Sequence, residues 1–177
     1  METDVTAKYQ YIINLIGAPP GGVTIWEMPY RGFPHALKAK ELEELGGERL
    51  ELIRAKGTKW HVFFNVEDCK EWAKEWGSSL QGAIELTLIH EISHGHATGE
   101  PPGLEFEEFA PNMARVQMKG LTNYLRWKPS AAPDLLAYIG ERFEVEDTWP
   151  IPPRFKSFLR KLRAEIQSSV LLRLPKV

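Results

Sequence analysis

Residues 86–94 contain two histidines and a glutamate at a spacing that can hold and use a metal ion: Leu-Thr-Leu-Ile-His-Glu-Ile-Ser-His. His90 and His94 are four residues apart, so on a helix both imidazoles lie on one side and can bind a single ion. Glu91 lies about 100° round the helix from His90. Its carboxylate can therefore accept a proton from water that the metal has made more acidic. The spacing predicts a Zn²⁺ site with His90 and His94 as ligands and Glu91 as the catalytic base.

The motif requires a helix, and the sequence predicts one over residues 80–97. Ser78 and Ser79 precede it as candidate caps, no proline interrupts it, and Gly99 followed by two prolines ends it. A chance match is the alternative interpretation, but unpartnered histidines and a glutamate would be costly to bury among apolar neighbours. Those neighbours recur at helical spacing, at Ile84, Leu88 and Ile92.

A catalytic zinc site needs a third protein ligand and one open position. We expect a second helix that begins near Leu104 and offers three glutamates. Glu107 shares a face with alanines on the two following turns, which would let this helix approach its neighbour closely. Glu108 falls on a polar face, and Glu105 lies at the helix start, where a negative charge suits the helix dipole. We therefore predict Glu107 as the third ligand, with Glu108 as the alternative.

The reaction also needs a donor that stabilises negative charge on the carbonyl oxygen. His96, Tyr124 and Tyr138 are candidates, and the sequence does not choose among them. His96 is turned about 200° from His94 on a helix, so we do not expect it to be a ligand. We interpret His61 as a half-exposed strand residue, because no metal-type spacing links it to other residues.

Composition indicates a globular protein of one domain, with or without a small appendage. The chain has 177 residues, 43% hydrophobic and 26% charged, and a net charge of −2 that directs it to neither nucleic acid nor membrane. Cys69 is the only cysteine, which excludes an internal disulfide and suits a reducing compartment. The acidic start of the chain lacks a signal-like apolar run, and we expect a cytoplasmic protein.

Turn signals divide the rest of the chain into short elements. Trp72 and Trp76, four residues apart, are interpreted as core packing. We expect an extended peptide substrate to bind along the exposed edge of a hairpin that precedes the motif. The predicted elements are helices at 6–16, 36–45, 68–76, 134–143 and 154–169, a strand at 23–28, and a hairpin of strands 50–54 and 59–66.

The motif stretch resembles the Phe-Thr-Leu-Ala-His-Glu-Leu-Gly-His of the ImmA/IrrE-type metallopeptidases. A strand that ends in Asn65 precedes it, as in that family, and the pattern Glu107-x-x-Ala-x-x-x-Ala is similar to the family's third-ligand helix. Ser93 stands where the family has glycine. The resemblance implies a zincin-like fold of the gluzincin kind, zinc-dependent peptidase activity, and often a helix-turn-helix repressor as substrate. It also implies a helix-turn-helix-like tail.

We therefore expect an α+β zincin-like metallopeptidase domain over residues 1–128, with a short sheet packed on the motif helix, and a helical extension over residues 129–177. The expected function is zinc-dependent endopeptidase activity on a protein or peptide substrate, such as a repressor. One alternative is an inactive zincin scaffold that serves as an interaction module. Another is a DNA-binding regulator, although we interpret the basic run over residues 154–163 as a solvated face.

Overall fold

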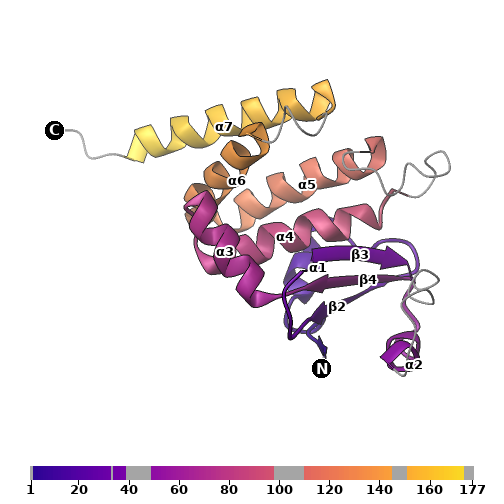
Figure 1. The fold of residues 1–177 in the computed structure, drawn as a ribbon. Coiled ribbons are helices and arrows are strands. Elements are labelled where there is room, and N and C mark those ends of the chain that lie inside the picture. The colour runs from indigo at the N-terminus through magenta and orange to yellow at the C-terminus, as the bar shows by residue number, and fades with distance from the viewer. Residues whose placement is uncertain (1, 33, 39–48, 98–109, 145–150, 174–177) are drawn as a thin grey trace.

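The computed structural model describes residues 2–32, 34–38, 49–97, 110–144 and 151–173. These ranges form an α+β arrangement in which helices stack on a small sheet (Figure 1). The elements are β1 (Thr3–Asp4), α1 (Gln10–Ile16), β2 (Val23–Glu27), β3 (Pro34–Lys38), α2 (Arg49–Arg54), β4 (Trp60–Phe64), α3 (Val66–Trp76), α4 (Leu80–His94), α5 (Pro111–Trp127), the short 3-10 helix η3 (Pro129–Ala131), α6 (Ala132–Glu144) and α7 (Pro153–Arg173).

The described strands form one mixed sheet in the order β1-β2-β4-β3. The inner strand β4 is parallel to β2 and antiparallel to β3, so that Val62 pairs with Ile25 on one side and Ala36 on the other. Every residue of β4 is buried, because both faces of the sheet are covered. The side chains of β4 alternate between the two faces, since Trp60, Val62 and Phe64 contribute to the main core and Phe63 to a smaller cluster on the opposite face.

The main core lies between one face of the sheet and the helices α1 and α4. Beyond α4, the helix α5 forms the next layer and α7 packs on it, whereas α6 packs on α4, α3 and α7 (Figure 1). Cys69 is fully buried in this core. The motif helix is thus an inner element with neighbours on both sides.

The helices after Trp127 share this core, and α6 and α7 confirm the predicted helices at 134–143 and 154–169. Leu135, Ile139, Phe155 and Leu159 are fully buried within the main core cluster. The outer side of α7 is basic, with Arg154, Arg160, Lys161 and Arg163 exposed. None of the described helices is long and apolar enough to cross a membrane. The division at residue 128 and the helix-turn-helix-like character stay predictions.

The predicted hairpin is wrong. Residues 50–54 belong to the helix α2, whose sequence Arg-Leu-Glu-Leu-Ile-Arg consists largely of good helix formers, and Ile53 packs on the smaller cluster. Lys56 follows this helix and pairs with Asp4 of β1, with Nζ 2.7 Å from Oδ2. The edge that the hairpin would have offered to a substrate is therefore absent.

The predicted helix at 36–45 is also wrong where the structure describes it. Residues 36–38 lie in the edge strand β3, and the remainder lies outside the described residues. Ala36 packs against the main core and Leu37 against the smaller cluster on the other face. Pairing with β4 supplies the backbone hydrogen bonds, and this outweighs the intrinsic helical preference of Ala, Leu and Lys.

His61 is fully buried, so its interpretation as half-exposed is wrong. The indole Nε1 of Trp26 donates a hydrogen bond to His61 Nδ1 at 3.1 Å, and the ring lies under the smaller cluster. Burial is the main cause that lowers the pKa of His61 below its ordinary value of 6.5. The folded protein therefore holds this imidazole neutral.

We expect His61 to make the protein less stable in mild acid. Its pKa is lower in the folded state than in the unfolded state, so its contribution is constant above pH 6.5 and stability is lost as the pH falls from 6.5 toward the lowered pKa. Relative to His61→Gln, which keeps an acceptor for Trp26, the free energy of unfolding of the wild type should fall by up to about 1.4 kcal/mol per pH unit in that window. Urea unfolding of both proteins at several pH values measures this, and a pH-independent difference would contradict it.

Candidate metal centre

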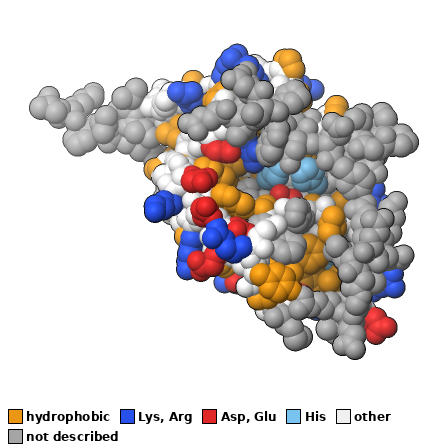
Figure 2. All heavy atoms as spheres, in the orientation of Figure 1, with side chains coloured by type: hydrophobic (Ala, Val, Ile, Leu, Met, Phe, Trp, Pro, Cys, Tyr) orange, Lys and Arg blue, Asp and Glu red, His pale blue; other side chains and the backbone are white. Residues whose placement is uncertain are grey.

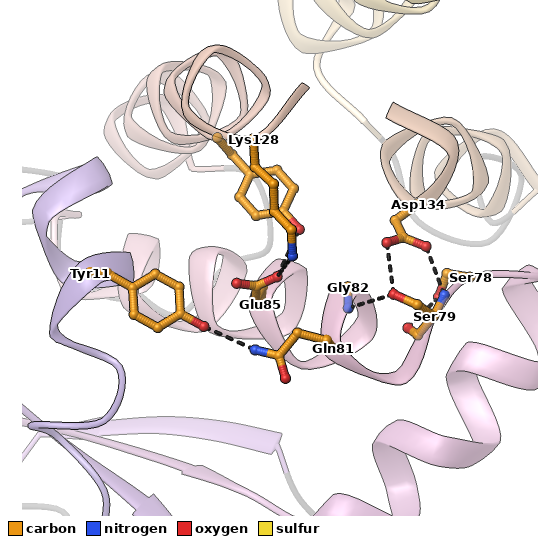
Figure 3. Close-up of polar contacts among 9 residues, drawn as sticks. Tyr11, Ser78, Ser79, Gln81, Gly82, Glu85, Lys128 and Asp134 are labelled. Carbon is orange, nitrogen blue, oxygen red and sulfur yellow. Dashed lines mark hydrogen bonds and ion pairs between the residues drawn. The ribbon is translucent and has the colours of Figure 1, made fainter. Parts of the chain in front are cut away.

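The N-terminus of α4 is fixed by a side-chain cap and by a carboxylate from α6 (Figure 3). Ser79, predicted as a candidate cap, accepts a hydrogen bond from the Gly82 backbone N–H at 3.0 Å. Asp134 in turn accepts from the Ser79 backbone N–H at 2.7 Å and from Ser79 Oγ at 2.8 Å. Asp134 lies so close to the helix that a Cβ at Gly82 would be 2.4 Å from its Oδ2. Glycine at this position therefore lets α6 approach α4.

One turn further along α4, Glu85 is a buried carboxylate with partners from α5 and from Lys128, which directly follows α5 (Figure 3). The Tyr124 hydroxyl donates to Glu85 Oε1 at 3.0 Å, and Lys128 Nζ donates to the same oxygen at 3.1 Å. Gln81 Nε2 donates to the Tyr11 hydroxyl of α1 at 2.9 Å on the same part of the helix. Polar contacts to three elements thus set the position and rotation of α4 before the motif begins.

The motif half of α4 is enclosed. All residues from Gly82 to Ser93 are buried, which includes the predicted apolar face of Ile84, Leu88 and Ile92. Ser93 Oγ donates to the Ile89 carbonyl at 2.6 Å, so the hydroxyl at the position where the resembling family has glycine is satisfied within the helix. The predicted helix is confirmed, although it ends at His94, earlier than Ala97. The Gly99 and proline signals lie outside the described residues.

His90, Glu91 and His94 form the group of possible metal ligands that the described residues contain. One ligand atom from each lies within 4.8 Å of the others. The two imidazole rings are nearly perpendicular, at 87°, with centroids 5.0 Å apart. His90 and Glu91 are buried, whereas His94 is partly exposed. The predicted juxtaposition of these three side chains is therefore present.

Glu107 and Glu108 lie outside the described residues, so the third ligand stays a prediction. The helix that was expected to carry them begins at Pro111, with Ala110 in a non-helical conformation at φ −48° and ψ 144°. Proline suits the first position of a helix and disfavours helical geometry in the residue before it. The prediction of one continuous helix from Leu104 is therefore wrong at Ala110, and the comparison of the faces of Glu107 and Glu108 depended on that helix. Ala110 and Ala114 are nevertheless buried.

His90 and Glu91 line a cavity of about 320 Å³ whose walls, within the described part of the chain, come from three helices and one strand. Each helix contributes residues at positions i, i+3 and i+4, so one stripe of each helix faces the cavity. Figure 2 shows histidine side chains at the surface of this face, next to acidic and hydrophobic side chains. The lining residues are Pro34 of β3; Trp72, Glu75 and Trp76 of α3; Thr87, His90 and Glu91 of α4; and Tyr138, Glu141 and Arg142 of α6.

Tyr138 is the candidate oxyanion donor that the structure brings to this cavity. Its hydroxyl accepts a hydrogen bond from Gln117 Nε2 at 2.6 Å, which orients the phenol. Tyr124 is engaged with Glu85 instead, and burial, together with that charge, raises the pKa of Tyr124. His96 is turned away, with Nε2 2.8 Å from the Gly17 carbonyl, and burial lowers the pKa of His96.

The sequence pattern did not single out the charged residues of the α6 wall. Arg142 is buried, its guanidinium lies 4.9 Å from the centre of the Tyr138 ring, and its Nε is 3.6 Å from Glu141 Oε2. The one available signal was their spacing of three and four residues from Tyr138, which places all three on one helical face. That signal identifies a face but not the cavity that the face lines.

Comparison of this chain with family models, with curated proteins and with solved structures gives no match. The resemblance to the ImmA/IrrE-type metallopeptidases therefore rests on the short motifs alone.

We expect Lys128→Ala to destabilise the protein by about 2 kcal/mol, because it leaves the Glu85 carboxylate buried without its cation. The cost should be below the ~3–5 kcal/mol of a fully buried pair, since water screens the partly exposed lysine. Lys70→Ala, which removes an exposed pair with Glu67, is the matched control and should cost under about 1 kcal/mol. Urea unfolding measures both, and equal effects would contradict a special role for Glu85.

Proposed function

We propose that this chain is a metal-dependent peptidase that acts on a protein or peptide substrate, with Zn²⁺ as its metal. The observation that carries the proposal is the grouping of His90, Glu91 and His94 within 4.8 Å on one buried helix, with His90 and Glu91 at the wall of a cavity. His90 and Glu91 are buried beside this cavity, and enclosing an imidazole and a carboxylate costs free energy that a bound ion can offset.

The residues present fit such an ion. The two imidazole nitrogens are donors that suit Zn²⁺ and related transition metals, and a carboxylate is a third donor that suits them as well. When bound, the metal would polarise the substrate carbonyl and make water more acidic. His90 and His94 would hold it, and Glu107 is the proposed third ligand.

Glu91 would move the proton. Its carboxylate accepts a proton from the attacking water, whose oxygen forms a bond to the carbonyl carbon. The carboxyl group then donates this proton to the nitrogen of the leaving amine, and the carbon–nitrogen bond breaks. The burial of Glu91 keeps this carboxylate near the reacting atoms and limits competition from bulk water. Tyr138 lies on the same cavity wall and has a hydroxyl suited to stabilise charge on the carbonyl oxygen.

The sheet offers a place for an extended substrate, although a different one from the predicted hairpin. β3 is an edge strand, packs against α4, and has no paired strand on its outer side within the described ranges. Pro34 at its start lines the cavity. An unfolded segment could add to this edge through backbone hydrogen bonds and reach the metal centre. A locally unfolded part of a helix-turn-helix repressor is a substrate of this kind.

The metal prediction separates ligands from the base. Protein saturated with Zn²⁺ should hold about one ion per chain, His90→Ala and His94→Ala should lose it, and Glu91→Gln should keep it while losing activity on an unfolded protein by about a hundredfold or more. His96→Ala is the matched histidine control and should keep both. Elemental analysis and cleavage of unfolded casein measure these outcomes. Absence of zinc from wild type refilled with the ion would refute the site, and zinc without cleavage would favour the inactive scaffold.

The third ligand is tested by two neighbouring glutamates. Glu107→Gln should weaken Zn²⁺ binding by at least about tenfold, because it removes one of three protein ligands, whereas Glu108→Gln should change it little. Competition with a zinc-sensitive chelating dye measures both affinities. Loss with Glu108→Gln alone would assign the ligand to Glu108, and unchanged affinity in both variants would place it elsewhere.

A further inference from the structure

The α3 wall of the cavity combines two indoles and a carboxylate. Trp72, Glu75 and Trp76 lie on one face of α3 and all line the cavity that contains His90 and Glu91. The two tryptophans are half-buried and also pack on the main core, as the core-packing interpretation requires. Glu75 is exposed, so it lies where the cavity meets solvent.

The indoles form a fixed surface. The Trp72 and Trp76 rings are nearly parallel, at 9°, with centroids 6.2 Å apart. The Trp76 ring meets the Tyr138 ring edge to face, with centroids 5.8 Å apart. Because these rings contact one another and the core, they present a rigid apolar wall that can bind the hydrocarbon part of a ligand with little loss of side-chain entropy.

The charges of the cavity favour a cation. Among the residues that the structure describes, three carboxylates line it, from Glu75, Glu91 and Glu141, against one guanidinium, from Arg142. Arg142 and Glu141 are adjacent in space, so their charges largely offset each other. Glu91 faces the metal centre. The carboxylate that remains at the solvent side is Glu75, on the same helix face as the two indoles.

We propose that this wall is a specificity pocket for a lysine or arginine side chain of the substrate, next to the bond that is cut. The hydrocarbon stem would lie along Trp72 and Trp76, the cationic head would contact an indole face, and its charge would lie near Glu75 in contact with water. The inference deepens the peptidase proposal and rests on it for the position of the scissile bond.

Other side chains fit this wall less well. A large aliphatic or aromatic side chain would use the indoles but would leave the Glu75 carboxylate partly desolvated without a partner. An acidic side chain would face three carboxylates, and the one guanidinium is already beside Glu141. Only a long cationic side chain satisfies both the indoles and Glu75.

Cleavage of unstructured peptides that differ at one position tests the pocket. Zn²⁺-loaded wild type should cut peptides with Lys or Arg beside the scissile bond with a kcat/KM at least about threefold above that for norleucine, which has a similar stem without charge. Glu75→Gln should reduce this preference by about two- to fivefold, and Glu75→Lys should abolish it. Each variant is also assayed on the norleucine peptides, and the preference is expressed as the ratio of the two kcat/KM values, so that a general loss of activity does not count as a loss of preference. Glu67→Gln, an exposed glutamate on α3 outside the cavity, is the matched control.

Binding provides a readout that does not need activity. The Glu91→Gln protein is titrated with Nα-acetyl-lysine amide, which keeps its cationic side chain, and with Nα-acetyl-norleucine amide, and binding is followed by tryptophan fluorescence. The lysine compound should bind more tightly, and adding Glu75→Lys to this protein should make the two affinities equal. Lysine binding without peptide cleavage would refute the peptidase proposal but support the pocket. Cleavage with equal rates for lysine and norleucine peptides would refute the pocket alone, and failure of both assays would refute both.

Discussion

The burial of α4 on all sides is the constraint on which the rest of the structure depends. A helix enclosed in this way has to carry apolar residues all round or supply a partner for each polar group. α4 carries Glu85, His90 and Glu91 in its buried stretch. Glu85 is satisfied by Tyr124 and Lys128, which tie α5 to α4. The surrounding helices are therefore needed to neutralise the polar residues of α4 as well as to cover its apolar ones.

This arrangement separates two functions along one helix. The first half of α4 is held by polar contacts that are complete within the protein, through Ser79, Asp134 and Glu85. The second half places its polar side chains at a cavity, where a ligand can reach them. Because the first half fixes the rotation of the helix, the side chains five and six residues after Glu85 have a defined direction. Precise metal geometry needs this kind of support from outside the ligand set.

The sequence predicted the elements with strong local signals and missed those decided by distant partners. The motif helix and its Ser79 cap followed from local residue types and spacing, and so did the grouping of His90, Glu91 and His94. Residues 50–54 and β3 were misassigned because their short segments have no decisive pattern, and burial of Ile53 and pairing with β4 determine the outcome. His61 was placed at a surface because sequence does not show that α2 covers the second face of the sheet.

The cavity could not have been predicted for a related reason. Its walls require three stripes, on α3, α4 and α6, to converge, and each stripe alone has an ordinary explanation. Trp72 and Trp76 pack on the core, Tyr138 binds Gln117, and Arg142 lies beside Glu141. What converts them into one site is the close approach of α6 to α4, which Gly82 permits and Asp134 fixes through Ser79. A hydrogen-bonded helix cap more than two turns from His90 thus sets the width of the space in front of it.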